Sequence, residues 1–147
     1  MRKFFNAYRI ASCLLVFYTI GHTLGAVIDT PKFGAEADSV ADLMKSVHVQ
    51  TQGFDCTWYG FYRGFGIFVS LFFALSAVMT WIVGGMSTVK RRTVLPLMWA
   101  LFASYATSVI VTLSYFFLVP ALFSSAITLA LGVGCFRDQT ATLPKEA

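Results

Sequence analysis

The stretch Trp58–Gly66, with the sequence Trp-Tyr-Gly-Phe-Tyr-Arg-Gly-Phe-Gly, opens the longest apolar segment of this chain. Tryptophan and tyrosine are enriched at membrane–water interfaces. From there the chain stays apolar to Met86, with Arg63 as its single charged residue. A segment of that length exceeds the ~20 residues needed to cross a bilayer. The stretch therefore predicts a membrane helix over Trp58–Met86, with Arg63 at the point where that helix enters the membrane.

The rest of the composition extends this prediction. Of 147 residues, 57% are hydrophobic and only 12% are charged, whereas a soluble domain carries about 25% charged residues. We therefore expect an all-α, polytopic membrane protein in one domain, an antiparallel bundle of four transmembrane helices with short connections after the second and third. The other three predicted spans are Ile10–Ile28, Val94–Leu118 and Ala121–Phe136.

An alternative for Ile10–Ile28 is a cleaved signal peptide. Thr19, His22 and Thr23 are unusual in the apolar region of such a peptide. The best cleavage site, after Ala26, also has Leu24 where a small residue is usual. The segment is therefore interpreted as the first transmembrane helix.

Basic residues set the expected orientation. Lysine and arginine concentrate on the cytoplasmic side of membrane proteins, so both termini are predicted to be cytoplasmic, in a bacterial inner membrane. The net charge of +4 does not indicate a nucleic-acid partner, because the basic residues flank apolar segments. The cytoplasmic set is Arg2, Lys3, Arg9, Lys90, Arg91, Arg92, Arg137 and Lys145, against Lys32, Lys45 and Arg63 on the other side.

The segment Asp29–Thr57 is the long polar part of the chain, predicted to lie outside. Its apolar residues recur at helical spacing, and Ser39 with Asp42 resembles a capping box. We expect a short amphipathic helix over Ser39–Val49, on the membrane surface or over the mouth of the bundle. The alternative is a surface helix that only connects. The apolar positions are Val40, Leu43, Met44 and Val47.

Two prolines and the C-terminal tail allow further structural predictions. Pro96 is expected in the first turn of the third span, where proline is tolerated. Pro120 is expected to mark a tight outer turn. The polar tail Arg137–Ala147 is expected to be disordered.

Polar side chains are predicted to converge in the outer halves of the four helices. An ionisable group inside a membrane is costly, so it usually faces the bundle interior and has a partner. We infer an outward-opening polar cleft with apolar walls, in which His22, Arg63 and Tyr62 are the candidate catalytic residues. The candidate ligand-binding residues are Tyr18, Thr19, Trp58, Tyr59, Ser108, Thr112 and Tyr115.

Each of these residues also has a structural interpretation. Arg63 can snorkel to the interface and bind lipid phosphate. His22 can serve only as a hydrogen-bonding residue between helices, and serine and threonine commonly join packed helices. The pairs Gly21/Gly25 and Gly60/Gly64 match small-xxx-small packing, which brings helices close together or joins two copies of a chain.

At Gly21-His22-Thr23-Leu24-Gly25 and Phe61-Tyr62-Arg63-Gly64-Phe65-Gly66 the chain resembles a family of small four-helix bacterial membrane proteins without an assigned activity. The resemblance covers roughly the first half of the chain. The family tends to have an acidic residue before the Phe-Tyr pair, where this chain has Gly60. The resemblance implies the four-helix class and carries no function over.

Two functions fit these observations. One is a lipid-binding protein, or an enzyme using proton transfer or redox chemistry, that takes a lipophilic molecule of quinone, isoprenoid or sterol type. His22 would exchange a proton, and Arg63 with Tyr62 would hold an oxygen. The other is a non-catalytic accessory or assembly subunit of a larger membrane complex, or a homo-oligomer, in contact with membrane lipids.

Several other classes are disfavoured. The sequence identifies no cofactor, and no nucleotide-binding loop or zinc motif is present. Haem ligation by two histidines would need a second chain, because His48 lies in the outer segment while His22 is in a span. Cys13, Cys56 and Cys135 lack the paired spacing of disulfide-exchange enzymes. No acidic residue falls inside a predicted span, which disfavours an ion-coupled transporter.

Overall fold

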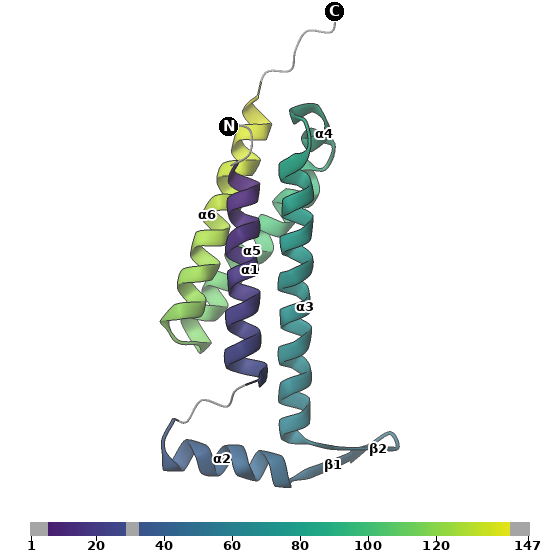
Figure 1. Ribbon diagram of the computed structural model, residues 1–147, viewed down its shortest axis with the longest axis vertical. Helices are drawn as coiled ribbons and strands as arrows, with labels where there is room; N and C mark the ends of the chain where they lie inside the picture. Colours follow the sequence, from purple (N-terminus) through teal and green to yellow (C-terminus); the bar gives the residue numbers. More distant parts are fainter. Residues whose placement is uncertain (1–5, 29–32, 142–147) are drawn as a thin grey trace, which may run out of the picture. The chain divides into compact units, whose positions relative to one another are not determined.

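The computed structural model describes residues 6–28 and 33–141, which are mostly helical (Figure 1). The chain forms two compact units: unit 1 comprises Met1–Tyr18 and Phe73–Ala147, and unit 2 comprises Thr19–Phe72. Within these described residues, three helices are long and apolar enough to cross a membrane, which confirms a helical, multi-pass membrane protein. They are α3 (Trp58–Gly85), α5 (Leu95–Tyr115) and α6 (Leu118–Thr140).

The first helix is divided between two hydrogen-bonding patterns. α1 covers Ala7–His22 in 16 residues, and a π-helix of 6 residues, η1 (Thr23–Ile28), follows it directly. The Asn6 side chain accepts the Arg9 N–H at 3.1 Å, which caps the start of α1. The predicted span Ile10–Ile28 is thus helical throughout, with a change of pitch at its end.

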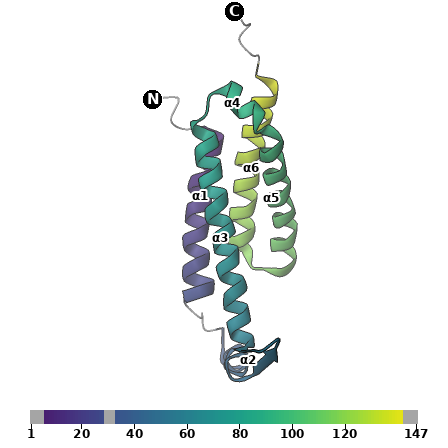
Figure 2. The ribbon, with the colours of Figure 1, turned by 90° about the vertical axis from the view of Figure 1, so that its right-hand side faces the viewer.

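The hydrophobic core lies in unit 1, where α5 and α6 make the most extensive helix–helix contact (Figure 2). Two glycines permit close packing there: a Cβ on Gly134 would lie 2.7 Å from the Tyr8 ring, and one on Gly84 would lie 2.7 Å from Arg9. By contrast, no described atom lies within 4 Å of a Cβ built on Gly21, Gly25 or Gly64. The expected close packing at Gly21/Gly25 and at Gly64 is therefore wrong within this chain.

The connections of unit 1 are more helical than predicted. The basic turn contains a short helix, α4 (Thr88–Thr93). α6 begins at Leu118 and takes Pro120 into its first turn, where the missing N–H costs nothing, so Pro120 marks no turn. α6 also runs past Phe136 to Thr140, so the first part of the predicted disordered tail is helical. Pro96 lies in the first turn of α5, as predicted.

Unit 2 departs further from the prediction. α2 covers Ala35–Ser46 rather than Ser39–Val49, so Ser39 does not cap it. The Ser39 hydroxyl instead donates to the Glu36 carbonyl at 2.7 Å, inside the helix. α2 is followed by a β-hairpin of β1 (His48–Thr51) and β2 (Phe54–Thr57), visible beside α2 in Figure 1. The prediction of an all-α chain misses this hairpin.

The hairpin turn is the two-residue loop Gln52-Gly53, because Thr51 pairs with Phe54 in an antiparallel register. Both loop residues have positive φ, 50° at Gln52 and 82° at Gly53. Turns with φ > 0 at both central positions match the twist of the flanking strands. The hairpin ends where α3 begins, so β2 leads directly into the membrane helix.

Candidate functional site

In unit 2, His22 is hydrogen-bonded to Ser70 across two helices, with 3.0 Å between its Nδ1 and the Ser70 Oγ. The Thr23 hydroxyl lies 2.9 Å from the same Ser70 oxygen and donates to the Thr19 carbonyl at 2.8 Å. Ser70 is buried and the other three are half-buried. His22 and Ser70 lie 48 residues apart, so no local spacing predicts this contact. Ser70 is a polar residue of the outer half of its helix, but it is not one of the candidate catalytic or ligand-binding residues.

The start of α3 gathers aromatic and cationic groups. The Arg63 guanidinium lies 6.0 Å from the Tyr59 ring centroid, and the Lys45 ammonium of α2 lies 5.5 Å from the same centroid. Tyr62 stacks against Tyr59 with 6.4 Å between ring centroids. Trp58 is 53% exposed and Tyr62 is 55% exposed. The structure thus keeps Tyr59, Tyr62 and Arg63 together and adds Lys45, which the sequence did not single out.

Two faces of α3 differ within unit 2. Arg63 and Ser70 are seven residues apart, which places them on one face about 10 Å apart along the axis. The other face is aromatic and exposed, with side chains spaced alternately three and four residues apart. Its members are Trp58, Phe61, Phe65, Phe68 and Phe72.

The remaining predicted site residues belong to unit 1. Tyr18 is buried and stacks on Phe73 and Phe123, with centroid distances of 4.4 and 5.2 Å. The hydroxyls of Ser108 and Thr112 donate to carbonyls of their own helix, at 3.0 and 2.8 Å. Such bonds satisfy a hydroxyl without a ligand.

Tyr115, at the end of α5, is 82% exposed. The predicted cleft draws its residues from both units, and it stays a prediction.

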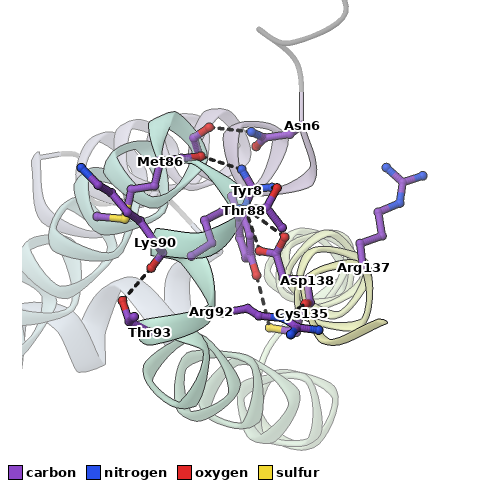
Figure 3. A network of polar contacts seen from close by, with 12 residues as sticks. Asn6, Tyr8, Met86, Thr88, Lys90, Arg92, Thr93, Cys135, Arg137 and Asp138 are labelled. Atoms are coloured by element: carbon purple, nitrogen blue, oxygen red, sulfur yellow. Dashed lines mark hydrogen bonds and ion pairs between the residues drawn. The ribbon is translucent and has the colours of Figure 1, made fainter. Parts of the chain in front are cut away.

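A polar network that the sequence did not predict ties α4 to the end of α6 (Figure 3). The Arg91 Nε donates to both Asp138 carboxylate oxygens, at 3.0 and 2.8 Å, and Asp138 is only 4% exposed. Arg92 donates to the carbonyls of Asp138, Gln139 and Ala141, at 3.0, 2.9 and 2.7 Å. Two basic residues thus bind the end of α6, where exposed carbonyls and the helix dipole favour cations.

A small, half-open pocket of about 130 Å³ lies beside this network. α6 continues through Asp138, so this acidic residue lies near the end of a helix that can span, two residues beyond the predicted span Ala121–Phe136. Its carboxylate is already paired with Arg91, so the pocket offers no unpaired acid. The residues lining the pocket are Asn6, Ala7, Tyr8, Arg91, Gly134, Arg137 and Asp138.

Potential metal-ligating side chains do not cluster in the described part of the chain. Within residues 6–28 and 33–141, no group of three or more His, Cys, Asp or Glu side chains comes together as metal ligands. His48 is paired with Asp55 across the hairpin, with 2.7 Å from its Nδ1 to the carboxylate. Cys135 is buried, and the Tyr8 hydroxyl lies 3.9 Å from its sulfur, in keeping with a packing role.

Comparisons of the chain with protein-family models, with curated proteins and with solved structures find no match. Function is therefore inferred from the residues of this chain. The polar contacts of His22 and the cations around Tyr59 are the two groupings in unit 2 on which such an inference can rest.

Proposed function

We propose that this chain is a protein of the bacterial inner membrane with four spans and cytoplasmic termini, and that it binds a lipophilic small molecule of quinone, isoprenoid or sterol type. The ligand's polar group lies at Arg63, near the outer end of α3. One observation carries this proposal. The Arg63 guanidinium is exposed on an apolar helix, and no hydrogen bond or ion pair to it occurs among the described residues.

Energetics support a bound partner for Arg63. An arginine at the centre of a membrane helix costs on the order of 3 kcal/mol, and less near the interface. A guanidinium presents five N–H donors, which suit an anionic or carbonyl oxygen. Inside the membrane the guanidinium lacks water as a hydrogen-bond acceptor, and a ligand oxygen would accept its hydrogen bonds instead. Tyr59 and Tyr62 beside it supply aromatic surface for the apolar part of the ligand.

His22 has a defined role in this proposal. Imidazole exchanges protons near neutral pH, and the Ser70 hydroxyl at 3.0 Å fixes the ring orientation. Ser70 lies on the face of α3 that carries Arg63, about two helical turns deeper. A ligand whose polar group reaches past Arg63 therefore meets His22, and an enzymatic step there would be proton transfer.

A second candidate function is an accessory or assembly subunit of a membrane complex. The exposed aromatic face of α3 favours it. Phe65, Phe68 and Phe72 are 68%, 60% and 63% exposed. Their heptad-like spacing suits packing against another membrane helix.

The first experiment is mass and absorbance analysis of what co-purifies with the protein in mild detergent. Wild type is compared with Arg63→Ala and His22→Ala, and Arg137→Ala serves as a control at an exposed arginine of unit 1. We expect one defined lipophilic molecule in wild type and Arg137→Ala that is lost from Arg63→Ala. Bulk phospholipid alone, unchanged in every variant, would refute ligand binding, and a stoichiometric protein partner would favour the second candidate.

A further inference from the structure

Two cations from different elements approach one aromatic ring in unit 2. Lys45 is on α2 and Arg63 is on α3, and each lies within 6.0 Å of the Tyr59 ring centroid. A cation over an aromatic face is stabilised by the ring quadrupole. Two positive charges beside one ring favour the binding of an anion near that ring.

The local fold explains why Lys45 reaches α3. The Trp58 N–H donates to the Val47 carbonyl at 3.3 Å, which closes the base of the hairpin and brings the end of α2 to the start of α3. The Thr57 hydroxyl accepts the Gly60 N–H at 3.0 Å and caps α3. Position 45 is therefore held near the first turns of the membrane helix by backbone contacts.

Two acids act on the Lys45 ammonium: Asp42 is ion-paired with it, and Asp38 also attracts it electrostatically. Lys45 donates to Asp42 at 2.9 Å, and both side chains are exposed, at 45% and 75%. An exposed pair of this kind is weak and is screened by salt. The hydrogen bond to Asp42 raises the pKa of Lys45, so the ammonium is fully charged at neutral pH. Arg63 adds a second positive charge, and no other acid of the described residues is ion-paired with either cation.

We infer that the polar group bound at this site is anionic, a phosphate or carboxylate held by Arg63 and Lys45 beside Tyr59, and that the ligand is an acidic lipid rather than a neutral one. This inference rests on the proposed function and narrows it. Arg63 donates hydrogen bonds to the anion and Lys45 acts as a second point charge. The apolar chain follows the exposed side chains of Ile67 and Leu71, which lie on the side of α3 that carries Arg63.

Gly60 provides a sharp test, because it lies one turn before Arg63 on α3. An acidic residue at position 60 would lie at i, i+3 to Arg63 and neutralise it. A Cβ at Gly60 would lie 3.3 Å from the Thr57 hydroxyl, and this tight contact is the same for any larger side chain. Gly60→Glu and Gly60→Gln are therefore matched in size and packing, and they differ only in charge.

The experiment measures binding of three probes with the same isoprenoid chain, and of inorganic phosphate, to the purified protein. Farnesyl monophosphate and farnesoic acid are the anionic probes, and farnesol is the neutral one. We expect one or both anionic probes to bind wild type and Gly60→Gln at least about tenfold more tightly than farnesol. Gly60→Glu and Arg63→Gln should lose that preference, and Lys45→Gln should reduce it, while Lys90→Gln in unit 1 should retain it.

The outcomes separate this inference from the proposed function. Farnesol binding as tightly as both acids, with Gly60→Glu unaffected, would overturn the anionic assignment and leave a neutral lipophilic ligand. No binding of any probe would overturn both. Inorganic phosphate binding as tightly as farnesyl monophosphate would overturn the lipid assignment, because the apolar chain would then contribute nothing.

Discussion

At the scale of single residues, Asp138 shows how this chain places a charge beside its core. Its side chain is 5% exposed, and its partner Arg91 is 19% exposed. Arg91 also donates to the Met86 carbonyl at 2.7 Å, so α4 is bonded both to the end of α3 and to α6. A buried pair of this kind need not stabilise the fold relative to apolar residues, but breaking it is costly because one charge is left unpaired.

We therefore predict that Arg91→Gln lowers the free energy of unfolding by about 3 kcal/mol. The glutamine cannot neutralise Asp138, whose carboxylate stays buried. The measurement is loss of helical circular dichroism during titration with sodium dodecyl sulfate in mixed micelles. Arg137→Gln is the control, since Arg137 is exposed and its side chain points away from the network (Figure 3). Equal unfolding curves for the two variants would show that the Arg91–Asp138 pair contributes nothing.

At the scale of elements, the hairpin of β1 and β2 connects α2 to α3. Its strands are four residues each and mostly exposed, so the turn rather than a core specifies the register. Positive φ at Gln52 is unusual for a residue with a side chain, whereas asparagine tolerates that conformation. Substitutions in this turn are therefore expected to raise or lower the stability of the hairpin.

We predict that Gln52→Asn stabilises the hairpin and that Gly53→Ala weakens it, each by roughly 1 kcal/mol or less. Alanine at position 53 would have to adopt φ near 82°. The measurement is amide hydrogen exchange at Thr51 and Phe54 in detergent micelles, which should slow in the first variant and quicken in the second. Exchange in Gly64 and its neighbours on α3 should not change, and opposite or absent effects at the turn would contradict the hairpin.

Particular elements show what sequence could and could not predict. The spans of α3 and α5 follow from apolar length, which is a local property. The sequence does not predict the hairpin, for two reasons. The helical spacing of Val40 to Val47 continues up to the first strand, and Gln52-Gly53 is a weaker signal for a two-residue turn than Asn-Gly. The end of α6 was missed because Arg137–Thr140 is polar like a tail, and its partners on α4 lie 46 to 49 residues earlier.

In the candidate site, too, some contacts can be predicted from sequence spacing and others cannot. Tyr59 and Arg63 are one helical turn apart, so their contact is predictable from spacing. Lys45 reaches Tyr59 only because the hairpin turns the chain back, and Ser70 meets His22 only because two helices pack together. Contacts between elements depend on tertiary packing, which no periodicity records.

At the scale of the whole molecule, the number of spans decides which side of the membrane each site faces. α3, α5 and α6 can cross by length and composition. α1 and η1 together are helical from Ala7 to Ile28, a length of about 30 Å, because α1 rises 1.5 Å per residue and the wider η1 rises less, and Arg9 is the single charge. That length matches the ~30 Å hydrocarbon core. A fourth span would place α2 and the hairpin on the side opposite both termini.

We predict this arrangement from the distribution of basic residues, because the connection through α4 carries Lys90, Arg91 and Arg92. The measurement is labelling of single cysteines by a membrane-impermeant maleimide in intact spheroplasts, after the three native cysteines are replaced by serine. Ala37→Cys on exposed α2 should be labelled, whereas Gln139→Cys and a cysteine added before Met1 should react only after the membrane is permeabilised.

Each other outcome identifies a different arrangement. Labelling of both Ala37→Cys and the added N-terminal cysteine would mean that α1 does not cross, so that only three helices span. Labelling of Gln139→Cys but not Ala37→Cys would invert the protein and turn Lys45, Tyr59 and Arg63 toward the cytoplasm. In that case the anionic ligand would have to come from the inner leaflet, where acidic phospholipids and soluble anions compete for the same two cations.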